Sequence, residues 1–444
     1  MKIYNTLTKK KETINPLEKG KLNIFVCGPT TYNLIHIGNA RTFTSFDFIV
    51  NYLRHKTFRV NYIQNLTDID DKIINAANEA KEDPLKFSEK YCKEFLIDMK
   101  DLGNTAVSKY VKSTEEMKNI ISQIERLLEK EFAYKTNDGI YFNISIDPEY
   151  GKLSGRTALQ AEDAVTRVDS SSEKKNKGDF CLWKFAKENE ISWDAPFSKG
   201  RPGWHIEDTA ITEKEFGPQY DIHGGAIDLI FPHHEAEIAQ MEAISNKKPF
   251  VKYWMHAGFL DMKKEKMSKS IGNIITLRDL LKQQSKETIR FFYASAHYRN
   301  RIEYSEENLE NSKNGLDRIN NFILNLNNQD DKELETTKKA FYAALDDDFN
   351  TPEAFAKIFE YISYCNKNKK GGKDTLSFFK EVNNIFKILN FNQEIPEEII
   401  KLAEKRLKAK KDKNWEKSDQ LRDQIQAKGF QIEDKEDSYL LRPN

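Results

Sequence analysis

Residues 25–39, FVCGPTTYNLIHIGN, constrain the fold of this chain more than any other stretch. The apolar residues at its start predict a buried strand. Gly28 and Pro29 end that strand, and helical spacing begins near Gly38. A strand, a glycine turn and a helix opening together present backbone N–H groups to a phosphate. Cys27 ends the strand, where ligands bind in open α/β sheets, so we expect a ligand site here.

A second apolar run, residues 60–66, follows the predicted helix at about residues 38–54. The two runs and the helix predict a βαβ unit with parallel strands. The second strand leads into an acidic segment that includes Asp68 and Asp70. These carboxylates can hold a cation or a substrate amine, or either one can cap the next helix. The two roles can coexist.

Residues from about 82 to 195 have a different character. Helical periodicity gives way to a small β-like patch at residues 139–144, and then to a polar run at residues 169–178. This pattern predicts an insertion between two halves of a nucleotide-binding fold. The second half begins near Gly200.

Two signals stand out in the second half. Asp208 and Thr209 are good N-caps for a helix, and His233 and Glu237 are four residues apart, on one face of a predicted helix. From about residue 276 onward, apolar residues three and four apart predict almost continuous helix.

Charge identifies no partner at the level of the whole chain, because Lys+Arg and Asp+Glu are 70 each. Residues 401–413, however, contain seven Lys/Arg and two Asp/Glu. Such a basic helical face favours contact with an RNA backbone, although it can also be plain solvated surface.

The sequence lacks the signals of secreted and membrane proteins, and this predicts the cellular location of the protein. The N-terminus has no apolar signal-peptide core, and no run approaches the roughly 18 apolar residues of a membrane span. The four cysteines form no C-x-x-C pair, which is typical of reduced thiols. We therefore expect a cytoplasmic protein that does not contact a membrane.

Two short motifs connect the chain to a known family. His36-Ile37-Gly38-Asn39 and Lys266-Met267-Ser268-Lys269-Ser270 together resemble the HIGH and KMSKS signatures of class I aminoacyl-tRNA synthetases. By composition alone the second motif is either a triphosphate-binding loop or a solvated loop. The stretches FVCGPT, NLTDIDDKII, GRPGWHIE, DIHGGAIDLIFPHHEAEIAQ and YWMHAGFL resemble the cysteinyl-tRNA synthetase family, almost from end to end.

The resemblance implies an α/β fold: a Rossmann-like parallel-sheet catalytic domain with a connective insertion, followed by an all-α C-terminal helical bundle. We expect the catalytic domain in two halves, 1–110 and 196–264, around an insertion at 111–195. After it we expect the KMSKS loop and stem-contact region at 265–325, a helical bundle at 326–390 and an anticodon-binding region at 391–444.

The implied reaction joins L-cysteine to the 3′ end of tRNA(Cys) through a cysteinyl-adenylate, with ATP and Mg2+. Asn39 stands where the family more often has histidine, and an amide can still donate. The catalytic residues implied are His36, Asn39, Lys266 and Lys269. The ATP contacts implied are Gly28, His36, Gly38, Asn39 and Lys269. The cysteine contacts implied are Cys27, Thr67, Trp204 and Asp228, with simple core packing as the alternative for Trp204.

The resemblance also implies one Zn2+ per chain, which selects the cysteine thiol. Its ligands map to Cys27, Asp208, His233 and Glu237. The family motif W-H-I-E-C has a second cysteine where this chain has Asp208. Three outcomes are open: Asp208 binds the metal through oxygen, or Cys27, His233 and Glu237 hold the metal without it, or the site holds no metal. In the last two, Asp208 can simply cap a helix. The remaining histidines nearby, His205, His223 and His234, can support the ligands or replace one.

The C-terminal region is implied to contact tRNA. We expect the protein to be a monomer. Two other functions stay open at this point: a ligase that joins cysteine to a small amino-sugar acceptor, and a non-catalytic RNA-binding relative. The expected tRNA contacts are Arg406, Lys408, Lys411, Lys413 and Trp415.

Overall fold

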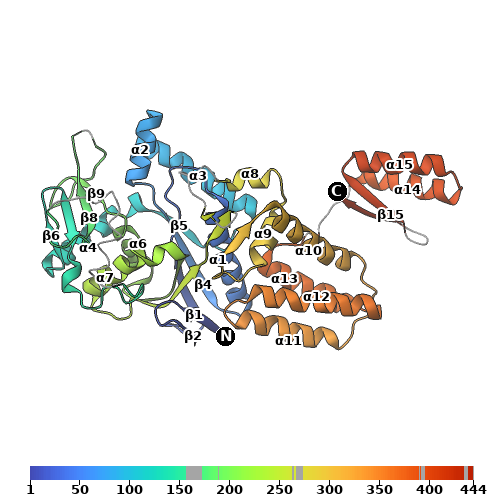
Figure 1. Ribbon diagram of the computed structural model, residues 1–444, viewed down its shortest axis with the longest axis horizontal. Coiled ribbons are helices and arrows are strands. Elements are labelled where there is room, and N and C mark those ends of the chain that lie inside the picture. The colour runs from blue at the N-terminus through green and yellow to red at the C-terminus, as the bar shows by residue number, and fades with distance from the viewer. Residues whose placement is uncertain are drawn as a thin grey trace. The chain divides into compact units, whose positions relative to one another are not determined.

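The computed structural model describes residues 1–156, 173–188, 190–262, 265–266, 274–389, 391, 396–434 and 439–443. The chain divides into two compact units, Met1–Ile388 and Leu389–Asn444 (Figure 1).

A five-stranded parallel sheet forms the centre of the first unit, with strand order β11-β10-β3-β4-β5. Helix α1 (Ile37–His55) connects β3 to β4, which confirms the predicted βαβ unit. From β3 the strands are added on one side as β4 and β5, and on the other side as β10 and β11. The strand order therefore reverses between β3 and β10, which is the topological switch point where ligands bind in such sheets. The strands are β3 (Lys21–Val26), β4 (Arg59–Leu66), β5 (Lys109–Lys112), β10 (Tyr220–Ala226) and β11 (Val251–Ala257).

The caps of two helices decide questions that the sequence left open. Asp70 is the N-cap of α2, and its carboxylate accepts from the backbone N–H of Lys72 at 2.8 Å. Asp68 instead accepts from the backbone N–H and the hydroxyl of Thr114. The predicted capping role of Asp208 is wrong, because the N-cap of α6 is His205 and Asp208 lies inside the first turn. The helices around the sheet are α2 (Asp71–Ala80), α3 (Pro84–Leu102), α4 (Met117–Glu129), α6 (Ile206–Phe216) and α7 (His233–Ser245).

Three smaller sheets surround the central one. The insertion contributes β6, β7 and β8 to an antiparallel sheet of order β6-β7-β8-β9, and β9 comes from the start of the second half. The N-terminus forms a hairpin, and a third sheet has order β13-β12-β14. The strands are β1 (Lys2–Asn5), β2 (Lys10–Thr13), β6 (Ala133–Lys135), β7 (Gly139–Phe142), β8 (Phe180–Phe185), β9 (Gly200–Pro202), β12 (Leu260–Met262), β13 (Glu265–Lys266) and β14 (Ile302–Tyr304). Short 3-10 helices are η1 (Ser113–Glu116), η2 (Ile144–Ile146) and η4 (Ile227–Ile230).

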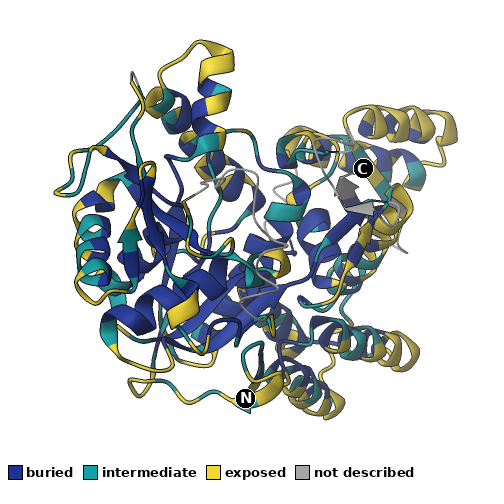
Figure 2. Ribbon diagram, turned by 60° about the vertical axis from the view of Figure 1, so that its left-hand side comes forward, coloured by how far each residue is buried: buried dark blue, intermediate teal, exposed yellow. Residues whose placement is uncertain are grey.

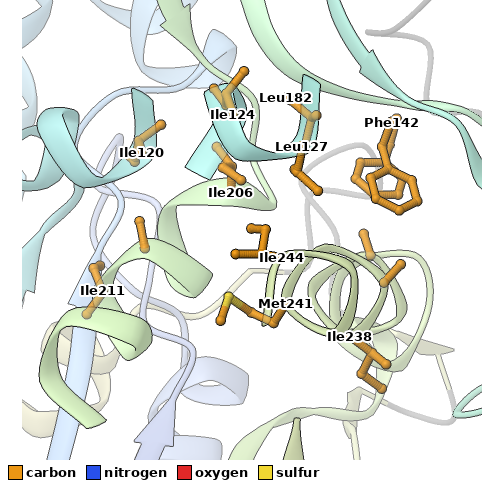
Figure 3. Packing of buried hydrophobic residues seen from close by; sticks show 14 of the residues in the cluster. Ile120, Ile124, Leu127, Phe142, Leu182, Ile206, Ile211, Ile238, Met241 and Ile244 are labelled. Carbon is orange, nitrogen blue, oxygen red and sulfur yellow. The ribbon is translucent and has the colours of Figure 1, made fainter. Parts of the chain in front are cut away.

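A hydrophobic core joins the insertion to the second half of the sheet domain. Side chains of α4, α6, α7 and β8 point toward one another in Figure 3, among them Ile124, Ile206, Met241 and Leu182. Figure 2 shows the strands of the central sheet buried and the outward faces of the surrounding helices exposed. The insertion is therefore packed onto the domain that it interrupts.

The rest of the first unit is mainly helical, in agreement with the sequence pattern, and α11, α12 and α13 lie side by side (Figure 1). A buried ion pair joins this region to α1: Arg290 Nη2 donates to Asp47 Oδ2 at 2.7 Å. The helices are α8 (Leu277–Leu281), α9 (Lys286–Ala294), α10 (Glu306–Leu324), α11 (Glu333–Asp346), α12 (Thr351–Asn368) and α13 (Lys373–Phe386).

The second unit contains α14 (Glu397–Lys411), α15 (Trp415–Ala427) and an antiparallel hairpin of β15 (Phe430–Asp434) and β16 (Tyr439–Pro443). Its small core includes Ile399, Ala403, Ile425 and Leu441. The sequence pattern predicted only helix for the C-terminal region, and it did not predict this hairpin.

All four cysteines are buried, and none of them forms a disulfide. Among the described residues, none of the helices combines the length and the apolar character needed to span a bilayer.

Candidate active site and metal centre

A cleft of about 550 Å3 lies at the carboxyl ends of β3 and β10, where the sheet topology places a ligand site. The cleft brings together residues that are far apart in the sequence. Six of the predicted site residues line it: Cys27, Gly28, His36, Asn39, Trp204 and Asp228.

The backbone at the end of β3 is fixed by close packing. A Cβ atom at Gly28 would lie 1.8 Å from the carbonyl oxygen of Asn65, so only glycine fits there. The backbone N–H of Gly28 donates to Asn65 Oδ1 at 2.5 Å. Thr67 is buried next to this contact, and its hydroxyl donates to Glu207 Oε1 at 2.7 Å. The predicted cysteine contact at Thr67 therefore has its hydroxyl committed to Glu207.

His36 opens α1 and faces the cleft. As the N-cap, its Nδ1 accepts from the backbone N–H of Asn39 at 3.2 Å. A neutral imidazole that accepts at Nδ1 carries its proton on Nε2, so this atom is a donor. Gly38 and Asn39 are half-buried in the first turn of the helix. The first signature therefore presents N–H donors at one end of the cleft.

The segment that follows the second signature is hydrogen-bonded to the first. Ile37 N donates to the carbonyl of Ile275 at 3.1 Å, and Leu277 N donates to the carbonyl of Ile35 at 2.9 Å. Thr276, in the same segment, lines the cleft. The segment that begins at Ile274 is thus anchored to the first signature, although more than 230 residues separate the two in the sequence.

The structure describes only the backbone of one of the two lysines of the second signature. Lys269 lies outside the described residues, and Lys266 is described only through its backbone, which pairs with Asp261 in β12 and β13. The catalytic roles predicted for both lysines, and the ATP contact predicted for Lys269, stay predictions.

At the other end of the cleft, the four predicted metal ligands come together, all buried and with donor atoms within 4.8 Å of one another. Cys27 Sγ lies 3.2 Å from Asp208 Oδ2 and 4.0 Å from Glu237 Oε1. His233 Nε2 lies 3.1 Å from both of those oxygens. These separations suit four ligands around one ion.

Two further histidines contact the same sulfur. His223 Nε2 and His234 Nε2 lie 3.2 and 3.1 Å from Cys27 Sγ, and with Glu237 they make a second possible ligand set. The two sets share a sulfur and a carboxylate, so they are alternative positions for one ion. Hydrogen bonds orient both rings: His223 Nδ1 lies 2.6 Å from the Tyr220 hydroxyl, and His234 Nδ1 lies 2.8 Å from His256 Nε2.

Without a cation, burial of several acidic groups in this cluster costs free energy. Burial raises the pKa of the Cys27 thiol, and the Asp208 and Glu237 carboxylates raise it further. Burial also raises the pKa of Glu237, with Asp208 and Glu207 adding to the effect. Burial lowers the pKa of His223 and His234, which keeps these rings neutral. Several acidic groups in a dry site call for a positive charge.

Two oxygens in this cluster have no hydrogen bond within the described part of the chain, Asp208 Oδ1 and Glu237 Oε2, although His223 Nδ1 lies 3.4 Å from the second. Buried polar atoms normally have partners, so these two need an explanation. A bound ion would supply it. The donor set of one thiol, one imidazole and two carboxylates therefore fits a metal such as Zn2+.

Trp204 connects the metal cluster to the cleft. Its ring stacks on that of His233, with centroids 4.5 Å apart and planes 18° apart, and the side chain remains 36% exposed. The alternative of simple core packing is therefore wrong for Trp204. Asp228, in η4, is exposed on the lining of the same cleft.

Sequence reasoning missed several residues of the site. Glu207 precedes Asp208 and supports Thr67, Asn65 fixes Gly28, and His256 orients His234. His256 and Asn65 both lie near the end of an apolar strand run, which is the signal that could have identified them.

The expected tRNA contacts lie in the second unit, and one of them needs correction. Arg406 is 1% exposed and donates through both terminal nitrogens to Asp434, at 2.5 and 3.0 Å. It is therefore a structural ion pair and not an exposed phosphate contact. Lys408, Lys411 and Lys413 are exposed, and Trp415 is 59% exposed.

Family models match most of the chain. The class I (C) tRNA synthetase catalytic domain matches residues 13–314, and the DALR domain matches residues 340–413. A relative named Cysteine–tRNA ligase from Thermococcus onnurineus (strain NA1) is 42% identical over 466 residues, covering 98% of this chain and 97% of the relative. One of the same name from Coxiella burnetii (strain Dugway 5J108-111) is 42% identical over 458 residues, covering all of both chains.

Solved structures support the fold at much lower identity. A methionyl-tRNA synthetase of Mycobacterium tuberculosis bound to methionyl-adenylate has a TM-score of 0.61 at 14% identity, over 78% of this chain and 83% of the other. A leucyl-tRNA synthetase complex of Agrobacterium radiobacter K84 has a TM-score of 0.62 at 10% identity, over 84% and 85%. With the thiol-centred cluster, the two signatures and full-length relatives of one name, the chain belongs to the cysteinyl-tRNA synthetase family, the class I aminoacyl-tRNA synthetases that ligate cysteine to tRNA.

Proposed function

We propose that the protein activates L-cysteine with ATP, releasing pyrophosphate, and then transfers the cysteinyl group from the adenylate to the 3′ end of tRNA(Cys). One observation carries this proposal: the buried Cys27 cluster and the donors of His36 and Asn39 open onto the same cleft. A thiol-selective group and a phosphate-binding group therefore face a common volume.

The first step needs positioning and charge neutralisation. A carboxylate oxygen of cysteine attacks the α-phosphorus of ATP, the bond from that phosphorus to the bridging oxygen breaks, and pyrophosphate leaves with Mg2+. His36 Nε2–H and the Asn39 amide would donate to phosphate oxygens at one end of the cleft. Lys266 and Lys269 would neutralise the departing pyrophosphate, and Gly28 and Gly38 would admit the nucleotide. No protein nucleophile is required.

The amino acid would lie at the other end, beside Trp204, with Asp228 on the same lining as a partner for its ammonium group. Cys27, Asp208, His233 and Glu237 would hold one Zn2+. When bound, the ion favours a thiolate and so distinguishes cysteine from serine and alanine, which a hydrophobic pocket rejects only weakly.

Geometry favours this ligand set over the one with His223 and His234. His233 stacks on Trp204, which lines the cleft, whereas His223 and His234 pack against Trp254 in the core. An ion at His233 is therefore nearer to the substrate, and the other two rings hold the Cys27 sulfur in place.

Metal analysis tests this assignment. Protein purified without chelator should contain about one zinc per chain, and Asp208→Ala should lower that content. Asp208→Cys replaces a carboxylate by a softer thiolate, so it should tighten zinc binding by roughly tenfold or more. Absence of zinc from repeated preparations would overturn the metal assignment, and unchanged affinity in both variants would remove Asp208 from the ligand set.

The reaction is tested by cysteine-dependent exchange between ATP and pyrophosphate, followed by charging of tRNA(Cys). Exchange without tRNA shows adenylate formation, and charging shows transfer. An enzyme that charges a small amino-sugar acceptor and not tRNA, or a protein without exchange, would contradict the proposal.

The second unit exposes groups that suit contact with a nucleic acid. Lys408, Lys411, Lys413 and Trp415 would contact tRNA, since they expose three cations and an aromatic face on one small unit. We also propose that the protein acts as a monomer in the cytoplasm, where its four buried cysteines stay reduced.

A further inference from the structure

A side pocket of about 120 Å3 adjoins the cleft at its Trp204 end. Both cavities are lined by Thr30, Lys72 and Trp204, so they meet at these residues. The side pocket lies between the first turn of α2 and the adjacent strands β8, in the insertion, and β9, just after it. It has room for several water molecules or for a sugar ring.

The walls of the side pocket are charged. Asp71 accepts from Lys184 Nζ at 2.6 Å and from Arg201, so these three side chains form one ion-paired wall. The Arg201 side chain is 7% exposed, and its Nε has no hydrogen-bond partner within the described part of the chain. The Asp70 carboxylate also lines the pocket. The site therefore offers a buried N–H donor and a carboxylate acceptor to a polar ligand.

Lys72 differs from the other cations of the pocket. Its side chain is exposed, and its ammonium lies 5.9 Å from the centroid of the Trp204 ring, on the rim that the two cavities share. Lys184 and Arg201 are held by Asp71, whereas Lys72 contacts an aromatic face. A cation in this position can turn toward an anion that crosses the rim.

The position of the pocket limits what can bind there. Trp204 stacks on His233, so the side pocket borders the amino-acid end of the cleft and not the end marked by His36. In the transfer step, the second substrate must bring a hydroxyl to the activated carboxyl group at this same end. A terminal nucleotide has ribose hydroxyls, which can donate hydrogen bonds to a carboxylate. It also has a phosphodiester, whose negative charge a lysine can neutralise.

We propose that the side pocket receives the ribose of the 3′-terminal nucleotide of the tRNA, with Asp70 and Arg201 contacting that ribose and with Lys72, on the rim, contacting the phosphate. This proposal rests on the proposed function. In the step it serves, a ribose hydroxyl oxygen bonds to the carbonyl carbon of the adenylate and the bond from that carbon to the phosphate oxygen breaks. AMP leaves and takes up the hydroxyl proton.

Variants of Lys72 separate transfer from activation. Lys72→Gln should lower kcat/KM for tRNA by about tenfold or more, the usual size of a lost charge-assisted contact, and change cysteine-dependent pyrophosphate exchange by less than about twofold. Lys72→Arg should recover most of the loss. Lys86→Gln, an exposed lysine near the start of α3, is the matched control and should change neither activity. Equal losses of exchange and charging in Lys72→Gln would overturn the proposal.

Binding of tRNA gives a second readout. Removing the terminal adenosine should weaken binding to the wild-type protein, and Lys72→Gln should weaken binding of intact tRNA. With both changes the losses should not add, because each removes the same contact. Additive losses would place Lys72 elsewhere on the tRNA and contradict the proposal. If the wild-type protein shows no exchange with cysteine, the proposed function fails, whereas intact exchange with additive losses rejects only the pocket assignment.

Discussion

The two ends of the cleft are built in opposite ways. At the thiol end, Cys27, His233 and Glu237 are 5%, 2% and 0% exposed, and they come from a strand end and one helix that pack into the core. At the phosphate end, His36 and Asn39 are half-buried, and the neighbouring Thr276 is held by backbone hydrogen bonds. In the proposed reaction, selection of a thiol needs rigid and dry donors, whereas a triphosphate and its Mg2+ must enter and leave through water. The contrast predicts that each end can be damaged without the other.

The largest effect is expected at the phosphate end. His36→Asn keeps an acceptor for the Asn39 N–H, and so preserves the helix cap, but it removes the Nε2–H donor. Pyrophosphate exchange should fall by about 100-fold or more, the scale of one lost transition-state donor. Zinc content and the thermal midpoint should stay close to those of the wild type. A variant that keeps more than a tenth of the exchange rate would remove His36 from the phosphate-binding role.

At the thiol end, zinc affinity should depend on pH. The pKa values of Cys27 and Glu237 are raised, mainly by burial, so these groups hold protons that a metal must displace. His223 and His234 have lowered pKa values and release none. Zinc affinity should therefore rise with pH, by about tenfold per unit for each proton released. Competition with a chelator at several pH values measures this slope, and a flat profile would contradict it.

The smallest effect is expected in the second unit. The double charge reversal Lys408→Glu with Lys411→Glu should raise KM for tRNA several-fold, more strongly at low salt, and leave pyrophosphate exchange unchanged. Lys10→Glu with Lys19→Glu, two exposed lysines of the first unit, is the matched control. A fall in exchange for the first pair, or an equal rise in KM for the control pair, would show that the effect is not local to the second unit.

Much of the fold follows from local patterns. Strand β3, helix α1 and strand β4 were predictable because apolar runs, a glycine turn and helical spacing lie next to one another in the chain. The i,i+4 spacing of His233 and Glu237 placed them on one face of α7, and the structure confirms it with a 3.1 Å contact. The meeting of Asp208 with Cys27 was expected only from the family resemblance.

What could not be predicted depends on contacts between distant segments. Arg406 is part of a basic run, but Asp434 on the C-terminal hairpin buries its guanidinium. His256 bridges His234 and the Thr6 hydroxyl, which belongs to the N-terminal segment. In each case the partner lies on an element whose position the sequence pattern does not reveal.

The burial of Cys27 also affects how readily its thiol is oxidised. Oxidation proceeds through the thiolate at accessible sites, and this thiol is almost inaccessible, has a raised pKa and is enclosed by neutral rings. In the proposed metal site, a chain without its metal would therefore keep a reduced sulfur that can bind metal again. The dry surroundings proposed to favour selection of a thiol would also protect this sulfur from irreversible oxidation.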